Sequence, residues 1–190
     1  MKAIAFVLGG AVLSTAIGLA AQQQDGERKD MKPAKPGPEH QVLRQFEGQW
    51  DADIRHCARH GASESAKGSE TSAFRLGGFW LMSEFKSTMK DQPFQGHGML
   101  GYDQGRKRYV MTWTSSMSSN LTLFEGDYDA TGKTLTLTAD CVAPDGKPMK
   151  LQAVHRVVDP DHTEFQLIGL GMESEGKDCP CMTIQYTRRR

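Results

Sequence analysis

The chain has 190 residues, with 23 lysines and arginines and 23 aspartates and glutamates, so its formal net charge is zero at neutral pH. This balance provides no basic surface of the kind that marks a nucleic-acid-binding protein. The length suits one domain with a hydrophobic core of its own.

Residues 1–21 have the three-part layout of a secretory signal peptide. Lys2 precedes a long apolar run, and Gly18 and Ala20 suit the small positions before a cleavage site. A retained membrane anchor is the alternative, but the run is short and meets the polar stretch "QQQDGERKD" directly. We therefore expect a secreted or periplasmic protein without a membrane span after cleavage.

The next segments predict a linker and one short helix. Residues 22–36 are polar and rich in lysine and proline, so they cannot bury enough apolar surface to order themselves. The stretch "GPEHQVLRQFEGQW" then spaces Val42, Leu43 and Phe46 at helical intervals. Pro38 suits a first helical turn and Gly48 a stop, which predicts a helix near residues 38–46.

From Trp50 onward, short runs punctuated by glycine, proline and aspartate predict about ten strands. The stretch "GASESAKGSE" between the first two is expected to be a loop. The candidate strands are "WDADIRHC", "TSAFRLGG", "FWLMSEFKSTM", "PFQGHGMLGYD", "RYVMTWTSSM", "NLTLFEGDYD", "KTLTLTADCV", "MKLQAVHRVV", "HTEFQLIGL" and "CMTIQYTRR". No crossover helix separates them, so we expect an all-β, antiparallel up-and-down barrel over residues 37–190, with a sandwich as the alternative.

Six ordered blocks resemble the bacterial domain-of-unknown-function family 1579, secreted proteins with a calycin-like or lipocalin-like barrel. They are "GPEHQVLRQFEGQW", "LGGFWLMSEF", "PFQGHGMLGYD", "YVMTWTSSMSS", "EGDYDATGKTLTLT" and "GKPMKLQAVHRVVD". The resemblance runs from about Pro36 to Arg188. It implies a lipocalin-like fold and brings no established activity. The chain has Thr114 and Ser115 where the family often has "TWID", so an acidic role at this place is not carried over.

Two glycines on one face of a predicted strand raise the question of what occupies their space. Gly96 and Gly98 alternate with His97, opposite the strand that contains Met111 and Trp113. Either a bulky neighbour covers the glycines, or the barrel holds a ligand-sized cavity. The residues predicted to line such a cavity are Trp50, Trp80, Glu84, Gly96, Gly98, Tyr102, Met111 and Trp113.

Three further residues are candidates for the barrel mouth or rim. Glu39 and His40 precede the first strand and could place charge at the mouth; alternatively Glu39 only favours the helix dipole and His40 is packed or exposed. Glu84 shares a face with Trp80 and Met82. A rim position is favoured for Glu84, because an unpaired buried carboxylate is costly.

The four cysteines form an even set in a chain expected to be exported, which favours disulfides. Strand alternation would gather Cys57, Cys141, Cys179 and Cys181 at one rim, with Cys57 and Cys181 pointing out of the barrel. We predict a bridge from Cys57 to Cys181, or to Cys179 if the register slips, and a second bridge from Cys141 to the remaining cysteine. A metal site that includes the "HCARH" stretch is the disfavoured alternative.

The sequence contains no reaction motif that would identify an enzyme: it lacks a nucleophile elbow, a zinc-protease motif, a P-loop and a dinucleotide fingerprint. The leading hypothesis is an exported protein that binds a small apolar or amphipathic ligand inside the barrel, without a cofactor. The alternatives are a hydrolase or isomerase that uses Glu84 or His40 as a base, and a structural module of the cell envelope.

Overall fold

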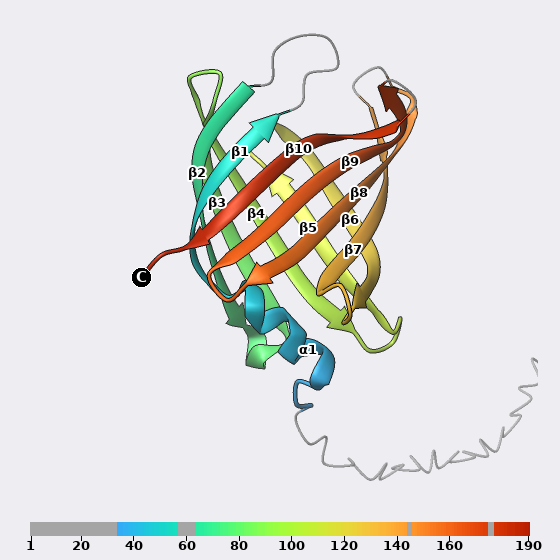
Figure 1. Ribbon diagram of the computed structural model, residues 1–190. Coiled ribbons are helices and arrows are strands. Elements are labelled where there is room, and N and C mark those ends of the chain that lie inside the picture. The colour runs from blue at the N-terminus through green and yellow to red at the C-terminus, as the bar shows by residue number, and fades with distance from the viewer. Residues whose placement is uncertain (1–33, 57–63, 144–145, 175–176) are drawn as a thin grey trace, which may run out of the picture. The chain divides into compact units, whose positions relative to one another are not determined.

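A computed structural model of the chain describes residues 34–56, 64–143, 146–174 and 177–190. The expected signal peptide and nearly all of the expected linker lie outside these residues. The described part forms a closed barrel in which each strand pairs antiparallel with the next and the first strand pairs with the last (Figure 1). The prediction of a ten-stranded up-and-down barrel is therefore confirmed, and the sandwich is excluded.

The strands follow one another around the wall in chain order. They are β1 (Gly48–His56), β2 (Glu64–Arg75), β3 (Trp80–Met89), β4 (Gln92–Asp103), β5 (Arg108–Ser115), β6 (Ser118–Asp129), β7 (Thr134–Val142), β8 (Pro148–Asp159), β9 (His162–Ser174) and β10 (Lys177–Arg188). Closure between β1 and β10 leaves no unpaired sheet edge, which removes the template for strand-to-strand aggregation.

One end of the barrel is covered by the predicted N-terminal helix, which consists of α1 (Pro38–Val42) and the 3-10 helix η1 (Leu43–Phe46) (Figure 1). Pro38 occupies the first helical position, where its missing N–H costs nothing. Leu43 and Phe46 are buried in the core. We call this end the helix end; a second 3-10 turn, η2 (Leu76–Gly78), links β2 and β3.

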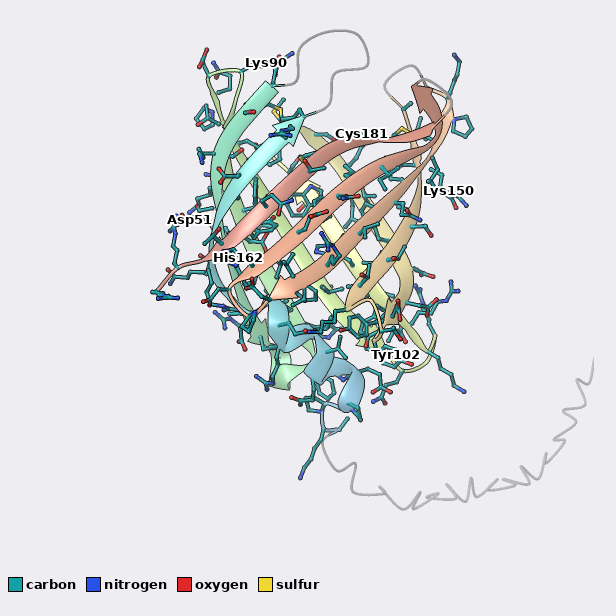
Figure 2. The ribbon with its side chains drawn as sticks, in the orientation of Figure 1. Asp51, Lys90, Tyr102, Lys150, His162 and Cys181 are labelled. Carbon is teal, nitrogen blue, oxygen red and sulfur yellow. The ribbon has the colours of Figure 1, made fainter. Side chains whose placement is uncertain are left out.

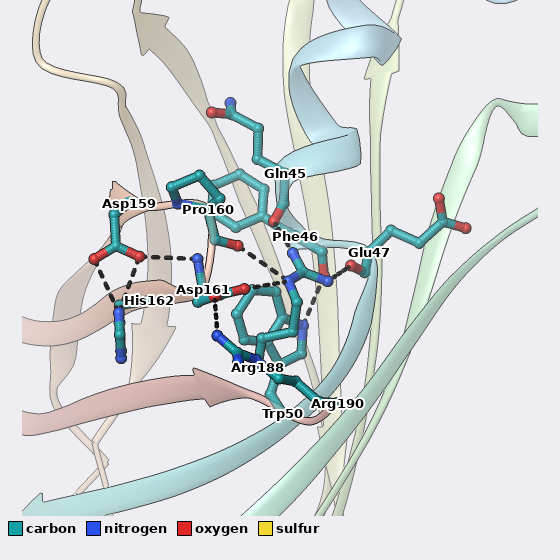
Figure 3. Close-up of polar contacts among 10 residues, drawn as sticks. All are labelled: Gln45, Phe46, Glu47, Trp50, Asp159, Pro160, Asp161, His162, Arg188 and Arg190. Atoms are coloured by element: carbon teal, nitrogen blue, oxygen red, sulfur yellow. Dashed lines mark hydrogen bonds and ion pairs between the residues drawn. The ribbon is translucent and has the colours of Figure 1, made fainter.

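Arg188 joins the last strand to η1 and to Glu47, the residue that follows it (Figure 3). Its guanidinium donates to the backbone carbonyls of Glu47 at 2.8 Å and Gln45 at 3.2 Å, and its Nε donates to the carbonyl of Pro160 at 3.0 Å. The guanidinium carbon also lies 4.0 Å from the centre of the Trp50 ring. A single side chain thus satisfies carbonyls from two separate segments.

The second strand begins earlier than the sequence indicates. Residues 61–70 were expected to form a loop, yet β2 starts at Glu64 and pairs with β1 from His56 to Gly48. Serine, glutamate, lysine and glycine have low strand propensity, and here pairing with β1, joined from Gly68 onward by pairing with β3, outweighs it. Gly68 allows the close approach of β3, because a Cβ there would lie 2.7 Å from the carbonyl oxygen of Lys86.

Trp113 occupies the space that Gly96 and Gly98 leave on β4. A Cβ at Gly96 would overlap the indole ring, and one at Gly98 would lie 3.4 Å from the ring atom Cε3 and 2.6 Å from the Ser83 hydroxyl. At these two positions the bulky-neighbour alternative is therefore correct. The glycines allow a tryptophan to lie flat against the inner wall.

Candidate ligand-binding cavity

The barrel encloses a cavity of about 460 Å³. It extends from Phe46 and Trp50 near the helix end to Met89 and Met117 beside the hairpin turns of the opposite end. Its wall is mainly apolar, with Leu81, Phe85, Phe94, Phe124, Phe165 and Ile184 among the lining side chains. The volume falls in the range of roughly 300–1,000 Å³ that is typical of small-molecule sites.

Four of the residues predicted to line a cavity border it: Trp50, Gly98, Met111 and Trp113. Gly96 is covered by the Trp113 ring and does not border the cavity. Tyr102 does not border it either, because its ring packs edge-on against Tyr109 at 5.1 Å, close to the helix end (Figure 2).

Trp80 and Glu84 lie on the outer face of β3, contrary to the predicted placement. They do share a face, but the inner face of this strand carries Leu81 and Phe85, which are buried. Glu84 is exposed and forms an ion pair with Lys86 at 2.8 Å. The hydrogen bond and charge of Lys86 lower the pKa of Glu84, which fits a solvated surface carboxylate.

Glu39 and His40 belong to the helix that covers the helix end and do not border the cavity. His40 is buried: its Nδ1 accepts a hydrogen bond from the Gly37 amide at 3.0 Å, and its ring packs edge-on against Phe79 at 5.3 Å. The carbonyl of Glu39 accepts a hydrogen bond from the Tyr109 hydroxyl at 3.1 Å. His40 is thus a packed histidine, which was the simpler of the two interpretations.

The most unusual group that borders the cavity is the carboxyl of Glu70 on β2. Its Oε1 accepts a hydrogen bond from the Ser72 hydroxyl at 2.7 Å, and its Oε2 accepts one from the Tyr186 hydroxyl at 2.8 Å. Burial raises the pKa of Glu70, and the two hydrogen bonds partly oppose this. Burial and the neighbouring carboxylate raise the pKa of Tyr186 well above its usual value.

His155 on β8 is a second polar group of the cavity wall, and its Nε2 atom is buried. Its ring packs against Phe165 at 4.7 Å and Phe46 at 5.7 Å, and its Nε2 has no hydrogen-bond partner. Burial lowers the pKa of His155 to about 4, so the ring is neutral at physiological pH. Thr163 on β9 is also buried and borders the cavity.

The sequence analysis did not identify Glu70 and His155 as residues of the cavity wall, for two different reasons. Glu70 lies in the stretch that was expected to be a loop, where a side chain has no assigned face. His155 lies on a correctly predicted strand, and its alternation with Leu151 and Ala153 would have placed it inward. That alternation was the available signal.

The cysteine predictions are only partly within the described residues. Cys141 and Cys181 both have free thiols in the structure, whereas Cys57 and Cys179 lie outside the residues whose side chains are described. Cys181 borders the cavity, so its predicted outward orientation is wrong. The reason is a pair of register shifts between Asp178 and Met182, which interrupt the inside-outside alternation of β10.

Among the described residues, no cluster of histidine, cysteine or acidic side chains could hold a metal ion. No helix in the described ranges is long and apolar enough to cross a membrane. The candidate site is therefore the barrel cavity with its polar set of Glu70, Ser72, Tyr186, Thr163 and His155.

Two solved structures with the same architecture are similar to this chain. Rv2717c from M. tuberculosis matches with a TM-score of 0.60 and 17% identity over 81% of this chain and 99% of that one. The S-type phycobiliprotein lyase CPES from Guillardia theta matches with a TM-score of 0.50 and 9% identity over 82% of this chain and 99% of that one. At these identities the likeness concerns the fold alone.

Among curated proteins, none matches the sequence. A protein family described as "Protein of unknown function (DUF1579)" matches residues 35–188, which include all ten strands and the N-terminal helix. The resemblance noted in the sequence is thereby confirmed, and the chain belongs to this family.

Proposed function

We propose that the protein binds a small, mainly apolar ligand inside its barrel. The observation that carries the proposal is the cavity of about 460 Å³, whose mainly apolar wall includes a few polar groups. This combination is typical of small-molecule sites. A barrel of the same type in a protein named as a phycobiliprotein lyase is consistent with the proposal.

The enzymatic alternative relied on Glu84 or His40 as a general base. Neither side chain borders the cavity, so neither would meet a ligand bound there. No other observation favours a second function, and binding is the function that the geometry supports best.

A neutral, polarity-sensitive dye such as Nile red tests the proposal directly. We expect saturable binding with increased dye emission, and quenching of the fluorescence of Trp50 and Trp113, because both border the cavity. A dye that binds without saturation, or not at all, would contradict the proposal.

A matched pair of variants on β6 locates the bound dye. Thr122 borders the cavity, whereas the next residue, Leu123, is exposed on the outer wall. Thr122→Phe should fill part of the cavity and weaken dye binding by about tenfold or more, since about 1.4 kcal/mol of lost binding energy is tenfold in affinity. Leu123→Phe should not, and equal effects of both would place the dye outside the barrel. Circular dichroism checks that both variants fold.

We also propose that the protein is exported and that its cysteines form disulfides in the oxidised protein. Sequencing the N-terminus of the mature protein tests the first point: it should begin near Ala21. Non-reducing peptide mapping tests the second, with a bridge expected from Cys57 to Cys181 or Cys179. An intact Met1, or four free thiols in the exported protein, would count against the respective proposal.

A further inference from the structure

Four of the polar side chains that border the cavity form a belt near the helix end. Glu70 on β2 and Tyr186 on β10 are joined by a hydrogen bond across β1. Thr163 pairs with Tyr186 from the next strand, β9, and His155 follows on β8, in contact with Phe46 of η1. Four neighbouring or near-neighbouring strands thus turn polar groups inward toward this part of the cavity, whose wall also includes His56, Ser83, Ser87, Ser115 and Thr122.

Each oxygen of the Glu70 carboxyl lies within hydrogen-bond distance of one hydroxyl group. Each of its two oxygens accepts a hydrogen bond from a hydroxyl group, and an ionised carboxylate can only accept. The neutral acid would need one hydroxyl to turn around and accept instead. The two hydroxyls therefore favour the carboxylate, but burial outweighs them and raises the pKa of Glu70.

This carboxylate has no positively charged partner among the described residues. The pKa of Glu70 is shifted by burial and by hydrogen bonds from the hydroxyls of Ser72 and Tyr186. Neither hydroxyl carries a positive charge. The Arg188 guanidinium is occupied by backbone carbonyls and the Trp50 ring. Two hydroxyl hydrogen bonds do not offset the cost of placing a charge in an apolar interior, which is several kcal/mol for an isolated ion.

On the basis of the proposed function, we infer that the ligand is a lipophilic amine whose ammonium group binds the Glu70 carboxylate at the helix end of the cavity. The apolar body of the ligand extends along the wall toward Met89 and Met117. An ammonium group has several N–H donors. One serves Glu70, and another can serve Nε2 of His155, which is buried without a partner and accepts in the neutral tautomer that carries its proton on Nδ1.

The same geometry disfavours the other common lipid-like heads. A carboxylate head would place like charges together in a low-dielectric space, which is strongly unfavourable. A hydroxyl head could hydrogen-bond to Glu70 but would leave its charge uncompensated. The site should therefore rank ligands with the same tail in the order amine, alcohol, acid.

Three probes with the same tail test this ranking: dodecylamine, dodecanol and laurate, each below its aggregation limit. Each is titrated by calorimetry and by displacement of Nile red from the wild-type protein. We expect dodecylamine to bind at least about tenfold more tightly than dodecanol, which corresponds to about 1.4 kcal/mol, and laurate to bind most weakly.

Two variants connect the preference to one carboxylate. In Glu70→Gln, the ratio of amine to alcohol affinity should fall close to one. In the matched control Asp127→Asn, which removes an exposed carboxylate from the outer wall of β6, the wild-type ratio should persist. Persistence of the preference in Glu70→Gln would show that surface charge causes it and would overturn the inference.

The outcomes separate this inference from the function on which it rests. If Nile red binds and dodecylamine does not bind more tightly than dodecanol, the cavity binds ligands but the inference about the amine is wrong. If neither the dye nor any of the three probes binds, the proposed function itself fails. If the Glu70 variant does not fold, a wild-type protein that binds dodecylamine no more tightly than dodecanol would still overturn the inference.

Discussion

Replacing Arg188 with alanine should destabilise the barrel strongly, although only two residues follow it in the sequence. The substitution removes hydrogen bonds to the carbonyls of Gln45, Glu47 and Pro160, together with the guanidinium stacked on the Trp50 ring (Figure 3). These contacts connect β10 to η1, to Glu47 after it and to the β8–β9 turn.

The magnitude follows from the number and setting of these contacts. The Arg188 side chain is 28% exposed, so water can replace part of what is lost. We therefore take about 0.5–1.5 kcal/mol for each hydrogen bond instead of the larger figure for buried charged groups. The contact with the Trp50 ring adds about 0.5–1 kcal/mol. A total of about 2–5 kcal/mol corresponds to a fall in Tm of roughly 5–15 °C for a domain of this size.

Thermal denaturation followed by circular dichroism measures this effect, and two further variants act as controls. Arg188→Lys keeps the charge but lacks the fork of donors that reaches two carbonyls at once, so its Tm should fall between wild type and Arg188→Ala. Arg190 lies two residues further on, is 90% exposed and forms only an ion pair with Asp161. Arg190→Ala should lower the Tm by no more than about 3 °C, since exposed ion pairs contribute about 0–1 kcal/mol.

The reasoning would be refuted if Arg188→Ala and Arg190→Ala had the same small effect. Such a result would mean that the carbonyls of the helix end are equally well satisfied by water. An Arg188→Lys variant as stable as wild type would refute the narrower point, that the planar fork of donors matters and not only the positive charge.

Three further predictions concern groups inside the barrel wall. Because burial raises the pKa of Glu70 above its ordinary value of 4.5, the folded protein retains a proton that the unfolded chain releases, and its stability falls as the pH rises above 4.5. Glu70→Gln should therefore raise the Tm at pH 7 relative to wild type but not at pH 4, as scanning calorimetry can measure. Because burial lowers the pKa of His155 from 6.5 to about 4, the stability linked to this group is complete above 6.5 and is lost as the pH falls toward 4. His155→Phe should make the free energy of unfolding, measured with denaturant, less dependent on pH between 6.5 and 4. The pH-dependent part that it removes should be at most about 3 kcal/mol. A Cβ at Gly126 would overlap the backbone of Thr136, whereas one at Gly96 would overlap only the Trp113 side chain. Gly96→Ala should thus lower the free energy of unfolding by about 1–3 kcal/mol, and Gly126→Ala should lower it more. Urea unfolding measures both losses, and equal losses would contradict the argument.

The sequence predicts the barrel well because its signals are local and repeated. Alternation along β1, for example, places Trp50, Ala52 and Ile54 on the inner face, and all three are buried. Glycine, proline and aspartate mark the turns between strands, and the absence of a crossover helix leaves antiparallel pairing. Closure follows because so many strands would otherwise leave two open edges.

The polar belt could not be predicted in the same way, because it depends on which strands are neighbours. Glu70 and Tyr186 are 116 positions apart, and they meet only because closure brings β2 and β10 to either side of β1. The face of Glu84 was assigned by grouping it with Trp80, but Trp80 packs on the outer wall over Gly101. An aromatic residue on a strand therefore does not by itself identify the inner face.

The effects expected at Glu70 have opposite signs in the free and in the bound protein, and this contrast bears directly on its role. In the free protein, the uncompensated charge lowers stability, so its removal should help folding. In the bound protein, an ammonium ion would compensate the charge, and a ligand that binds only the folded state adds stability by mass action. Dodecylamine should therefore raise the Tm of wild type more than that of Glu70→Gln, even though the unliganded variant starts from the higher Tm. If Glu70 had only a structural role, its replacement would change the Tm of the free and of the bound protein by the same amount. The rise in Tm that dodecylamine causes would then be the same in wild type and in Glu70→Gln.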